Sequence, residues 1–366
     1  MKVFVVVGTR PEIIRLSSLL SFMEDMPTID LVVAYTNQNF TYSLSKIFFD
    51  DLNLKAPKYV LNNKVMKPMQ FLGAALTWVT ELLEVEQPDC FLCLGDTNSC
   101  LTALAAKKMQ IPIFHLEAGN RCFDETVPEE TNRKVVDHLA DVNMTYSGIS
   151  REYLLREGKR PDLVFNVGSP LYEVYERNKK NIASSNAMNM LGLGKGTYVL
   201  LSFHRHEALV SNDKRNAVID AINFLADAGE KIIYPIHPKS RSIIPKDAFH
   251  PAVSTIEPLG YNDYMHLQIN SKCVISDSGT INEEASICNF PAINIRATHE
   301  RPEANECSQT IMTGYDSQGI VKAFYSIPHL CTNNQVNSYT NEDFSRNVTS
   351  LIMSYTPFVI EYIYAK

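Results

Sequence analysis

Short apolar runs alternate with longer amphipathic segments along almost the whole chain, and this alternation restricts the fold more than any other feature. In the first half the expected strands are 2–7, 30–35, 89–94, 111–116, 141–146 and 163–167. The expected helices between them are 11–22, 42–52, 69–84, 98–108, 129–139 and 149–157. Strands separated by helices in this way form a parallel sheet with helices on both faces. Helical spacing within 69–84 predicts a core stripe of Met69, Leu72, Leu76, Val79, Leu82 and Leu83.

The alternation resumes after a polar stretch at 178–195. The strands expected there are 198–202, 231–235, 253–257, 273–276 and 291–295, and the helices are 212–228, 263–269, 280–288 and 318–326. We therefore predict an α/β fold of two Rossmann-like, doubly wound domains facing each other across a cleft. The first is expected to span 1–168 and the second 169–350, with a C-terminal helix at 351–366 packed back on the first.

Composition and charge exclude several classes of function. The formal net charge is −7 and no stripe of Lys and Arg occurs, so we expect no nucleic-acid partner. No apolar run approaches the roughly 20 residues that cross a bilayer, and the first apolar run is too short for a signal peptide. These features predict a cytoplasmic protein with no membrane partner. The eight scattered cysteines form no disulfide framework, and Cys90 and Cys93 lie inside an apolar strand, which disfavours a metal or redox role.

Polar residues follow the strands of the first half at their carboxyl ends, where open parallel sheets bind ligands. In the turn 8–12, Arg10 either faces solvent or clamps an anion beside the helix N-terminus. Asp96 and Glu117 follow two later strands. Glu129 and a second glutamate open a helix, where capping alone can also explain a carboxylate. Three carboxylates near one cleft suit acid and base roles, and crowding is expected to raise the pKa of at least one.

The second half carries a pattern typical of phosphate binding. Ser278, Gly279 and Thr280 connect a strand to a helix, whose free N–H groups and neighbouring hydroxyls suit a phosphate. An ordinary capped helix is the alternative. Glu284 could hold ribose hydroxyls, and Arg301 supplies a cation.

Two histidines of the second half also follow strands, and either a structural or a ligand-binding role fits them. They are His204 and His237. The pair His204 and His206 lacks a third ligand, so no metal site is expected.

Together these residues resemble the non-hydrolysing UDP-N-acetylglucosamine 2-epimerase family. The matching pieces are GTRPE (8–12), GDTN (95–98), EAGNR (117–121), PEETNRK (128–134), the pair His204-Arg205, DSGTINEE (277–284) and ERPE (300–303). The resemblance implies a glycosyltransferase-B-like fold, a homodimer and a UDP-sugar substrate. It also implies that no metal or nicotinamide cofactor is needed.

Within the family, the chain is most similar to the branch that converts UDP-2-acetamido-2,6-dideoxy-L-talose to UDP-N-acetyl-L-fucosamine. That branch, which supplies capsule or lipopolysaccharide O-antigen synthesis, carries GTRPEIIRLS, LGDTNSC and EAGNRCFD, all present here. Glucosamine-type members instead carry GDTTT, EAGLR and DSGGIQEE. Their GQH segment is also missing from 36–40, so activation by substrate is not expected. Asn37, His206 and the segment 303–307 depart from the branch and could shift the sugar preference.

The resemblance also implies roles for individual residues. The catalytic set is Asp96, Glu117, Glu129 and His204. The set that binds UDP or substrate is Arg10, Arg15, His237, Ser278, Gly279, Thr280, Glu284 and Arg301. The C2 hydrogen of a nucleotide sugar is not acidic, so UDP must leave first, giving a 2-acetamidoglycal to which UDP is added back. Carboxylates would transfer the protons, while cations and N–H groups would stabilise the departing UDP.

Three alternatives stay open at this point. The first is a UDP-N-acetylglucosamine 2-epimerase that gives UDP-N-acetylmannosamine. The second is a glycosyltransferase with the same fold. The third is an inactive nucleotide-sugar sensor, which would have little need of acids around C2.

Overall fold

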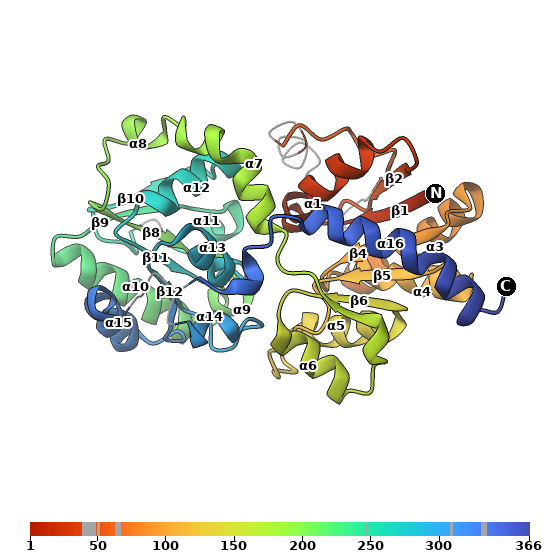
Figure 1. The fold of residues 1–366 in the computed structure, drawn as a ribbon. Coiled ribbons are helices and arrows are strands. Elements are labelled where there is room, and N and C mark those ends of the chain that lie inside the picture. Colours follow the sequence, from red (N-terminus) through yellow and green to blue (C-terminus); the bar gives the residue numbers. More distant parts are fainter. Residues whose placement is uncertain (39–48, 50–51, 63–66, 246, 308–309, 331–334) are drawn as a thin grey trace. The chain divides into compact units, whose positions relative to one another are not determined.

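The chain folds into two compact units, each a parallel α/β domain (Figure 1). The computed structural model describes residues 1–38, 49, 52–62, 67–245, 247–307, 310–330 and 335–366. One unit comprises Met1–Arg177 with Asn337–Lys366, and the other comprises Asn178–Val336. The prediction of two doubly wound domains is confirmed.

The first unit contains a seven-stranded sheet in the order β3-β2-β1-β4-β5-β6-β7, with every neighbouring pair parallel. Its strands are β1 (Lys2–Val7), β2 (Asp30–Tyr35), β3 (Tyr59–Val60), β4 (Cys90–Leu94), β5 (Ile113–Leu116), β6 (Val142–Thr145) and β7 (Val164–Asn166). Its helices are α1 (Arg10–Glu24), α3 (Pro68–Glu86), α4 (Ala103–Lys108), α5 (Pro128–Leu139), α6 (Gly148–Arg156) and α16 (Phe344–Tyr362). The 3-10 turns η1 (Cys100–Thr102), η2 (Pro161–Leu163) and η3 (Asn337–Tyr339) complete the unit.

The second unit contains a six-stranded parallel sheet in the order β10-β9-β8-β11-β12-β13. Its strands are β8 (Tyr198–Ser202), β9 (Lys231–Pro235), β10 (Val253–Ile256), β11 (Cys273–Ser276), β12 (Ala292–Asn294) and β13 (Thr310–Met312). Its helices are α8 (Ala187–Met190), α9 (His206–Leu209), α10 (Asn212–Asp227), α11 (Pro238–Ile243), α12 (Tyr261–Asn270), α13 (Ile281–Cys288), α14 (Glu303–Glu306) and α15 (Ser317–Leu330). The remaining helix, α7 (Leu171–Ala183), begins in the first unit and ends in the second.

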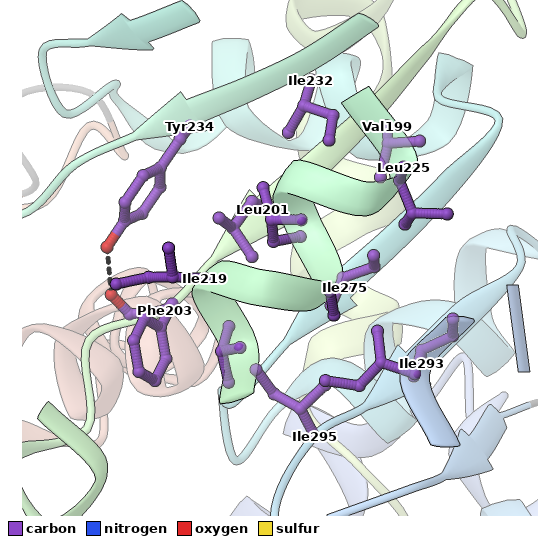
Figure 2. Close-up of a cluster of buried hydrophobic side chains, with 14 of the residues drawn as sticks. Val199, Leu201, Phe203, Ile219, Leu225, Ile232, Tyr234, Ile275, Ile293 and Ile295 are labelled. Atoms are coloured by element: carbon purple, nitrogen blue, oxygen red, sulfur yellow. Dashed lines mark hydrogen bonds between the residues drawn. The ribbon is translucent and has the colours of Figure 1, made fainter. Parts of the chain in front are cut away.

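One face of the second sheet packs against α10 and α15 through a continuous apolar core (Figure 2). Val199 and Leu201 of β8 meet Ile219 and Leu225 of α10 within this cluster. Burial of such aliphatic side chains stabilises a domain by about 1.5–3 kcal/mol each. The hydroxyl of Tyr234 donates to the carbonyl of Phe203, the residue before His204 (Figure 2). The core therefore extends to the loop that carries a proposed site residue.

The unit boundaries differ from the expected 168 and 350 because the C-terminal segment returns to the first unit well before residue 350. Asn341 Nδ2 donates to the carbonyl of Val167 at 2.6 Å, and Ser345 donates to the carboxylate of Glu173. The last helix, α16, lies along α1 (Figure 1). The polar stretch at 178–195, expected to interrupt the pattern, contains the end of α7 and the short helix α8.

Two strands and one core residue were not predicted correctly. The strands β3 and β13 have only two and three residues, too short to show an apolar pattern. Met69, expected in the core, is 75% exposed because only the later turns of α3 pack against the apolar cluster of the first unit. The expected helix 42–52 lies outside the described residues, apart from residues 49 and 52.

Gly8, between β1 and α1, should not accept a side chain. A Cβ there would overlap Ser99 Oγ and would lie 2.9 Å from Thr36 Oγ1. Because such overpacking costs about 1–3 kcal/mol, we expect Gly8→Ala to lower the free energy of unfolding by about that amount. Urea unfolding followed by the fluorescence of Trp78, the single tryptophan, measures it in the first unit.

Gly73→Ala is the matched control for this substitution. Gly73 lies inside α3 with open space at its Cβ, so alanine there should stabilise the helix by up to about 1 kcal/mol. Equal effects of the two substitutions would contradict the close approach of Gly8 to Ser99.

Candidate active site

Three neighbouring strands of the first unit, β1, β4 and β5, end in the loops that carry the expected polar residues. Their carboxyl ends lie side by side because β1 pairs with β4 and β4 pairs with β5. Asp96 follows β4 and Glu117 follows β5, so the two carboxylates come from adjacent strand ends. The sheet topology therefore brings these two candidate residues into one region of the first unit.

Glu117 is buried and forms an ion pair with Arg15, which is also buried. Its other carboxylate oxygen, Oε1, accepts a hydrogen bond from Asn120 Nδ2 at 3.2 Å. The backbone of Glu117 is left-handed, with φ at 65°, a conformation that costs a non-glycine residue free energy and is often found at functional sites. Both carboxylate oxygens are thus oriented by side chains before any ligand is present.

Asp96 is partly exposed and is also held by an arginine. Arg133 of α5 donates to Asp96 Oδ2 through Nε at 3.0 Å and through Nη2 at 2.7 Å. Asn132 donates to the carbonyl of Asp96 and to the side chain of Asn98. Helix α5 therefore orients the loop that follows β4.

The two glutamates that open α5 have different surroundings. Glu130 is fully buried and accepts hydrogen bonds from the backbone N–H of Cys122 and from Arg133 Nη1. Burial opposes ionisation, but these hydrogen bonds and the nearby guanidinium outweigh it and hold the pKa of Glu130 below its usual range. Glu129 is partly exposed. Glu130 therefore has the structural, loop-holding role, which leaves Glu129 as the candidate for chemistry.

Glu12, in the turn 8–12, is a buried carboxyl group with a raised pKa. Glu12 is buried and accepts hydrogen bonds from the backbone N–H groups of Gly8 and Thr9 at 3.1 and 2.6 Å. Burial raises the pKa of Glu12 to about 7, although these hydrogen bonds and one from Thr97 work in the other direction. Glu12 is not one of the three carboxylates at which crowding was expected to raise the pKa, and the cause of its raised pKa is burial.

Arg10 begins α1 and is exposed. It belongs to the same turn as Glu12, whose carboxylate ties the start of the helix to the end of β1. Among the candidate arginines of the first unit, Arg15 is buried in its ion pair with Glu117, whereas Arg10 is exposed.

In the second unit, a buried aspartate holds His204 at the end of β8. Asp277, which follows β11, accepts from the backbone N–H groups of His204 and Arg205 at 2.9 and 2.8 Å. The imidazole Nδ1 of His204 lies 3.1 Å from Asp277 Oδ1, while 45% of the His204 side chain remains exposed. Burial opposes ionisation of Asp277, but His204 and the two N–H groups keep the pKa of Asp277 below its usual range.

The turn that precedes α13 has the features of an anion site. Guanidinium groups of Arg205 and Arg296 lie near Gly279, 3.5 and 3.7 Å from the position a Cβ would take there. Arg301 Nη1 donates to the carbonyl of Gly279 at 3.1 Å. The first N–H groups of a helix have no intrahelical partners, so this cationic turn can accept a phosphate.

Hydroxyl groups on both sides of Gly279 are linked to each other. The hydroxyls of Ser278 and Thr280 lie 2.9 Å apart, and Thr280 Oγ1 donates to Glu284 Oε1 at 2.7 Å. Glu284 also accepts from Gln268, at 2.8 Å. The expected ribose ligand Glu284 is thus tied to the phosphate turn, and His237 is half-buried just beyond β9.

Within the described part of the chain, no group of three or more His, Cys, Asp or Glu side chains is arranged to hold a metal ion. Cys90 and Cys93 are both buried, and burial raises the pKa of Cys90 to about 12. None of the described helices is long and apolar enough to cross a membrane.

Comparison with known proteins agrees with this geometry. A family model described as UDP-N-acetylglucosamine 2-epimerase matches residues 22–353. The chain belongs to the UDP-N-acetylglucosamine 2-epimerase family. As a member of this family, it is an enzyme of the isomerase class.

Individual relatives resemble the chain over nearly its whole length. The solved structure of UDP-N-acetylglucosamine 2-epimerase from Rickettsia bellii is 36% identical, with a TM-score of 0.92 and 100% of both chains covered. The Methanocaldococcus jannaschii UDP-GlcNAc 2-epimerase, solved in complex with UDP-GlcNAc and UDP, is 31% identical with a TM-score of 0.90. That match covers 97% of this chain and 100% of the other.

A relative that acts on a different sugar also matches. The UDP-2,3-diacetamido-2,3-dideoxy-D-glucuronate 2-epimerase of Pseudomonas aeruginosa is 28% identical over 327 residues, which cover 88% of this chain and 91% of that protein. The names of the relatives therefore include more than one UDP-sugar.

In this member of the epimerase family, sequence reasoning named candidate site residues but gave no role to several of the groups that orient them. The residues without a predicted role are Glu12, Arg133, Asp137 and Asp277. A structural role for Asp137 and Asp277 could have been predicted, because each is an acidic residue next to apolar or small residues. The sequence carries no signal for the pairing of Arg133 with Asp96, which are 37 residues apart.

The raised pKa of Glu12 predicts a pH dependence of stability. The folded state retains the proton to higher pH than the unfolded chain. The contribution of Glu12 is therefore complete below about pH 4.5 and is lost as the pH rises through 7. We expect Glu12→Gln, which keeps an acceptor for the N–H of Thr9, to reduce this fall in unfolding free energy by about 2 kcal/mol. Urea unfolding of both proteins at about pH 5 and pH 7.5 measures the difference.

Glu84→Gln provides the control for Glu12→Gln, because Glu84 is an exposed glutamate on α3. It should leave the wild-type difference between the two pH values unchanged. An equal effect of the two substitutions would refute the assignment to Glu12.

Proposed function

We propose that this chain inverts C2 of UDP-2-acetamido-2,6-dideoxy-L-talose to give UDP-N-acetyl-L-fucosamine. The proposal is supported by the contacts of residues at which the sequence differs from the glucosamine-type pattern. Asn120, where that pattern has Leu, donates to Glu117 Oε1. Asn98, where it has Thr, bonds to the same Asn132 side chain that holds the loop of Asp96. The residues that distinguish the branch thus lie against the candidate catalytic groups.

A further departure from the glucosamine-type pattern lies in the second unit. Thr280 stands where that pattern has Gly, and its hydroxyl bonds to both Ser278 and Glu284. The glucosamine-type turn would have no side-chain hydroxyl at this place. Thr280 therefore supports a difference in how the diphosphate or the sugar is held.

In the proposed reaction, different residues bind the phosphates and transfer the protons. The turn at Ser278 and Gly279, with Arg205 and Arg301, binds the pyrophosphate and stabilises its charge as the C1–O bond breaks. His204 contributes a further donor to the same phosphates. The first unit supplies the carboxylates that act at C2.

UDP leaves with the electron pair of the C1–O bond, and the proton at C2 is then removed, which gives a 2-acetamidoglycal. A proton is then delivered to the opposite face of C2, and a phosphate oxygen of UDP adds back to C1. Asp96, Glu117 and Glu129 are the proposed acids and bases for these two transfers. No atoms or electrons are gained or lost overall, so the reaction needs no oxidant or reductant.

The second candidate is epimerisation of UDP-N-acetylglucosamine. The names of the Rickettsia bellii and Methanocaldococcus jannaschii relatives favour it. Both candidates use the same phosphate turn and the same carboxylates, and they differ in the sugar.

Proton NMR in D2O separates the two candidates. The purified protein is incubated with UDP-2-acetamido-2,6-dideoxy-L-talose in one tube and with UDP-N-acetylglucosamine in another. We expect deuterium at C2 and a new epimer in the first tube only. Exchange in the second tube alone would replace the proposal by the UDP-N-acetylglucosamine reaction. Exchange in neither tube, with UDP still bound, would indicate a transferase or a sensor.

Glu117→Gln should separate catalysis from binding. The amide retains the shape of the side chain but cannot accept and return a proton, so we expect turnover to fall by about 100- to 10,000-fold. UDP affinity, measured by calorimetry, should change less than about threefold because the proposed phosphate contacts lie in the second unit. Glu152→Gln, at an exposed glutamate of α6, is the control. Wild-type turnover in Glu117→Gln would remove Glu117 from the mechanism.

A further inference from the structure

A fully buried histidine lies beneath both carboxylate loops of the first unit. His115 is on β5, the strand that ends just before Glu117. Its Nδ1 lies 2.9 Å from Asp137 Oδ1, and its Nε2 lies 2.8 Å from the carbonyl oxygen of Gly95. Gly95 directly precedes Asp96. The imidazole therefore contacts the backbone of one catalytic loop and a side chain of α5.

The two partners of the ring determine its protonation. A carbonyl oxygen only accepts hydrogen bonds, so Nε2 must carry a proton. The Asp137 carboxylate also only accepts, because it receives bonds from Gly119 and Arg121 as well, so Nδ1 must carry one too. A histidine with protons on both nitrogens is an imidazolium, and His115 is thus a buried cation.

Asp137 connects this cation to the second catalytic loop. Both of its carboxylate oxygens lie 3.2 Å from the backbone nitrogen of Gly119, two residues after Glu117. Gly119 has a φ of 79°, and a side chain there would collide with the carbonyl of Ser150. The chain Gly95, His115, Asp137, Gly119 therefore joins the loop of Asp96 to the loop of Glu117.

The charges around the ring balance. Arg121, from the turn after β5, donates to Asp137 Oδ2 at 2.7 Å and pairs with Glu157, which follows α6. The cluster thus holds two cations, His115 and Arg121, and two anions, Asp137 and Glu157. Buried charges are stable when paired in this way, whereas loss of one partner leaves another uncompensated.

The groups facing the ring come from every element packed on it. They are Cys93 on β4, Asp137 on α5 and the neutral Asn143 on β6, which donates to the carbonyl of Asp137. Arg121, in the turn after β5, acts on the ring through its ion pair with Asp137. Burial alone would lower the pKa of His115. The hydrogen bond to Asp137, the electrostatic interactions with Cys93 and Asp137 and the bond to Gly95 outweigh burial and raise the pKa of His115 to about 9.

We propose that His115, as an imidazolium, is a positioning residue that fixes the carboxylates of Asp96 and Glu117 relative to each other. The inference rests on the proposed function, in which these two carboxylates act at C2 of the sugar. His115 does not touch substrate. Its proton is structural, and its loss breaks the link between the two loops.

This role predicts that kcat falls at alkaline pH, when the ring loses a proton. Below about pH 9 the ring donates to both partners, and above it one nitrogen becomes an acceptor facing another acceptor. One of the two links must then break. Since a misplacement of about 1 Å can cost 100-fold in rate, we expect kcat to fall as the pH rises through 9, while KM changes little.

His115→Gln tests the positioning role directly. The glutamine amide can donate to Gly95 or to Asp137, but its oxygen then faces the other acceptor. We expect kcat at about pH 7.5 to fall by about 10- to 100-fold, with KM within about threefold and UDP affinity unchanged. His329→Gln is the control, because His329 is an exposed histidine on α15, outside this charge cluster. It should leave kcat and the pH profile as in the wild type.

Asp137→Asn tests the role of the charge. Without the carboxylate the imidazolium loses its main stabilising partner, so the alkaline limb of kcat should move by at least about one pH unit toward neutrality. A purely structural histidine would not shift this limb. If His115→Gln keeps kcat within about twofold of the wild type with an unchanged alkaline limb, the proposal is overturned.

NMR of the wild-type protein labelled with 15N-histidine tests whether His115 is an imidazolium, even where a variant fails to fold. We expect one buried imidazolium with both ring N–H protons at about pH 7.5, lost with a midpoint near 9. An active enzyme without this signal would overturn the inference and leave the proposed function standing. A protein that shows the signal but exchanges C2 of neither UDP-sugar would instead overturn the proposed function.

Discussion

Buried charge has to be paired, and in this chain that requirement shapes the loops at the strand ends. In the first unit Arg15 pairs with Glu117, Arg133 pairs with Asp96, and Asp137 lies between His115 and Arg121. Each pair joins segments from different strands or helices. Removing one member would leave an uncompensated charge in a region of low dielectric, which is far more costly than an exposed unpaired residue. The candidate catalytic carboxylates are therefore held in place by the same interactions that stabilise the loops.

The second unit also contains a buried carboxylate that holds the loop of a candidate residue. Asp277, fully buried directly after β11, accepts hydrogen bonds from two backbone N–H groups and lies against the imidazole of His204. It thereby links the end of β11 to the end of β8, the two strands that carry the proposed phosphate ligands. In both units a buried acid between adjacent strand ends positions a residue proposed to act on the substrate, while the acid itself stays away from the chemistry.

The sequence predicted the pattern of strands and helices well, because each central strand is a short run of apolar residues bounded by polar ones. β1, β2, β8, β9 and β11 have the expected bounds. The prediction was wrong where local pattern is weak. The strands β3 and β13 are too short to show alternation, and Met69 fits the helical period but is exposed, although Phe71 in the same turn of α3 is buried. The unit boundary at Val336 depends on hydrogen bonds between segments more than 170 residues apart.

The sequence by itself determined the fold class, the order of the motifs and the residue types available at each strand end. Those properties depend on local periodicity and on short motifs, which a linear sequence contains in full. Only the tertiary structure decided that Glu130 holds a loop while Glu129 is left partly exposed, and that burial gives Glu12 a pKa near 7. It alone decided that His115 meets acceptors on both ring nitrogens. The reason is physical: protonation and pairing depend on which distant groups lie within about 3 Å and on how much water they exclude.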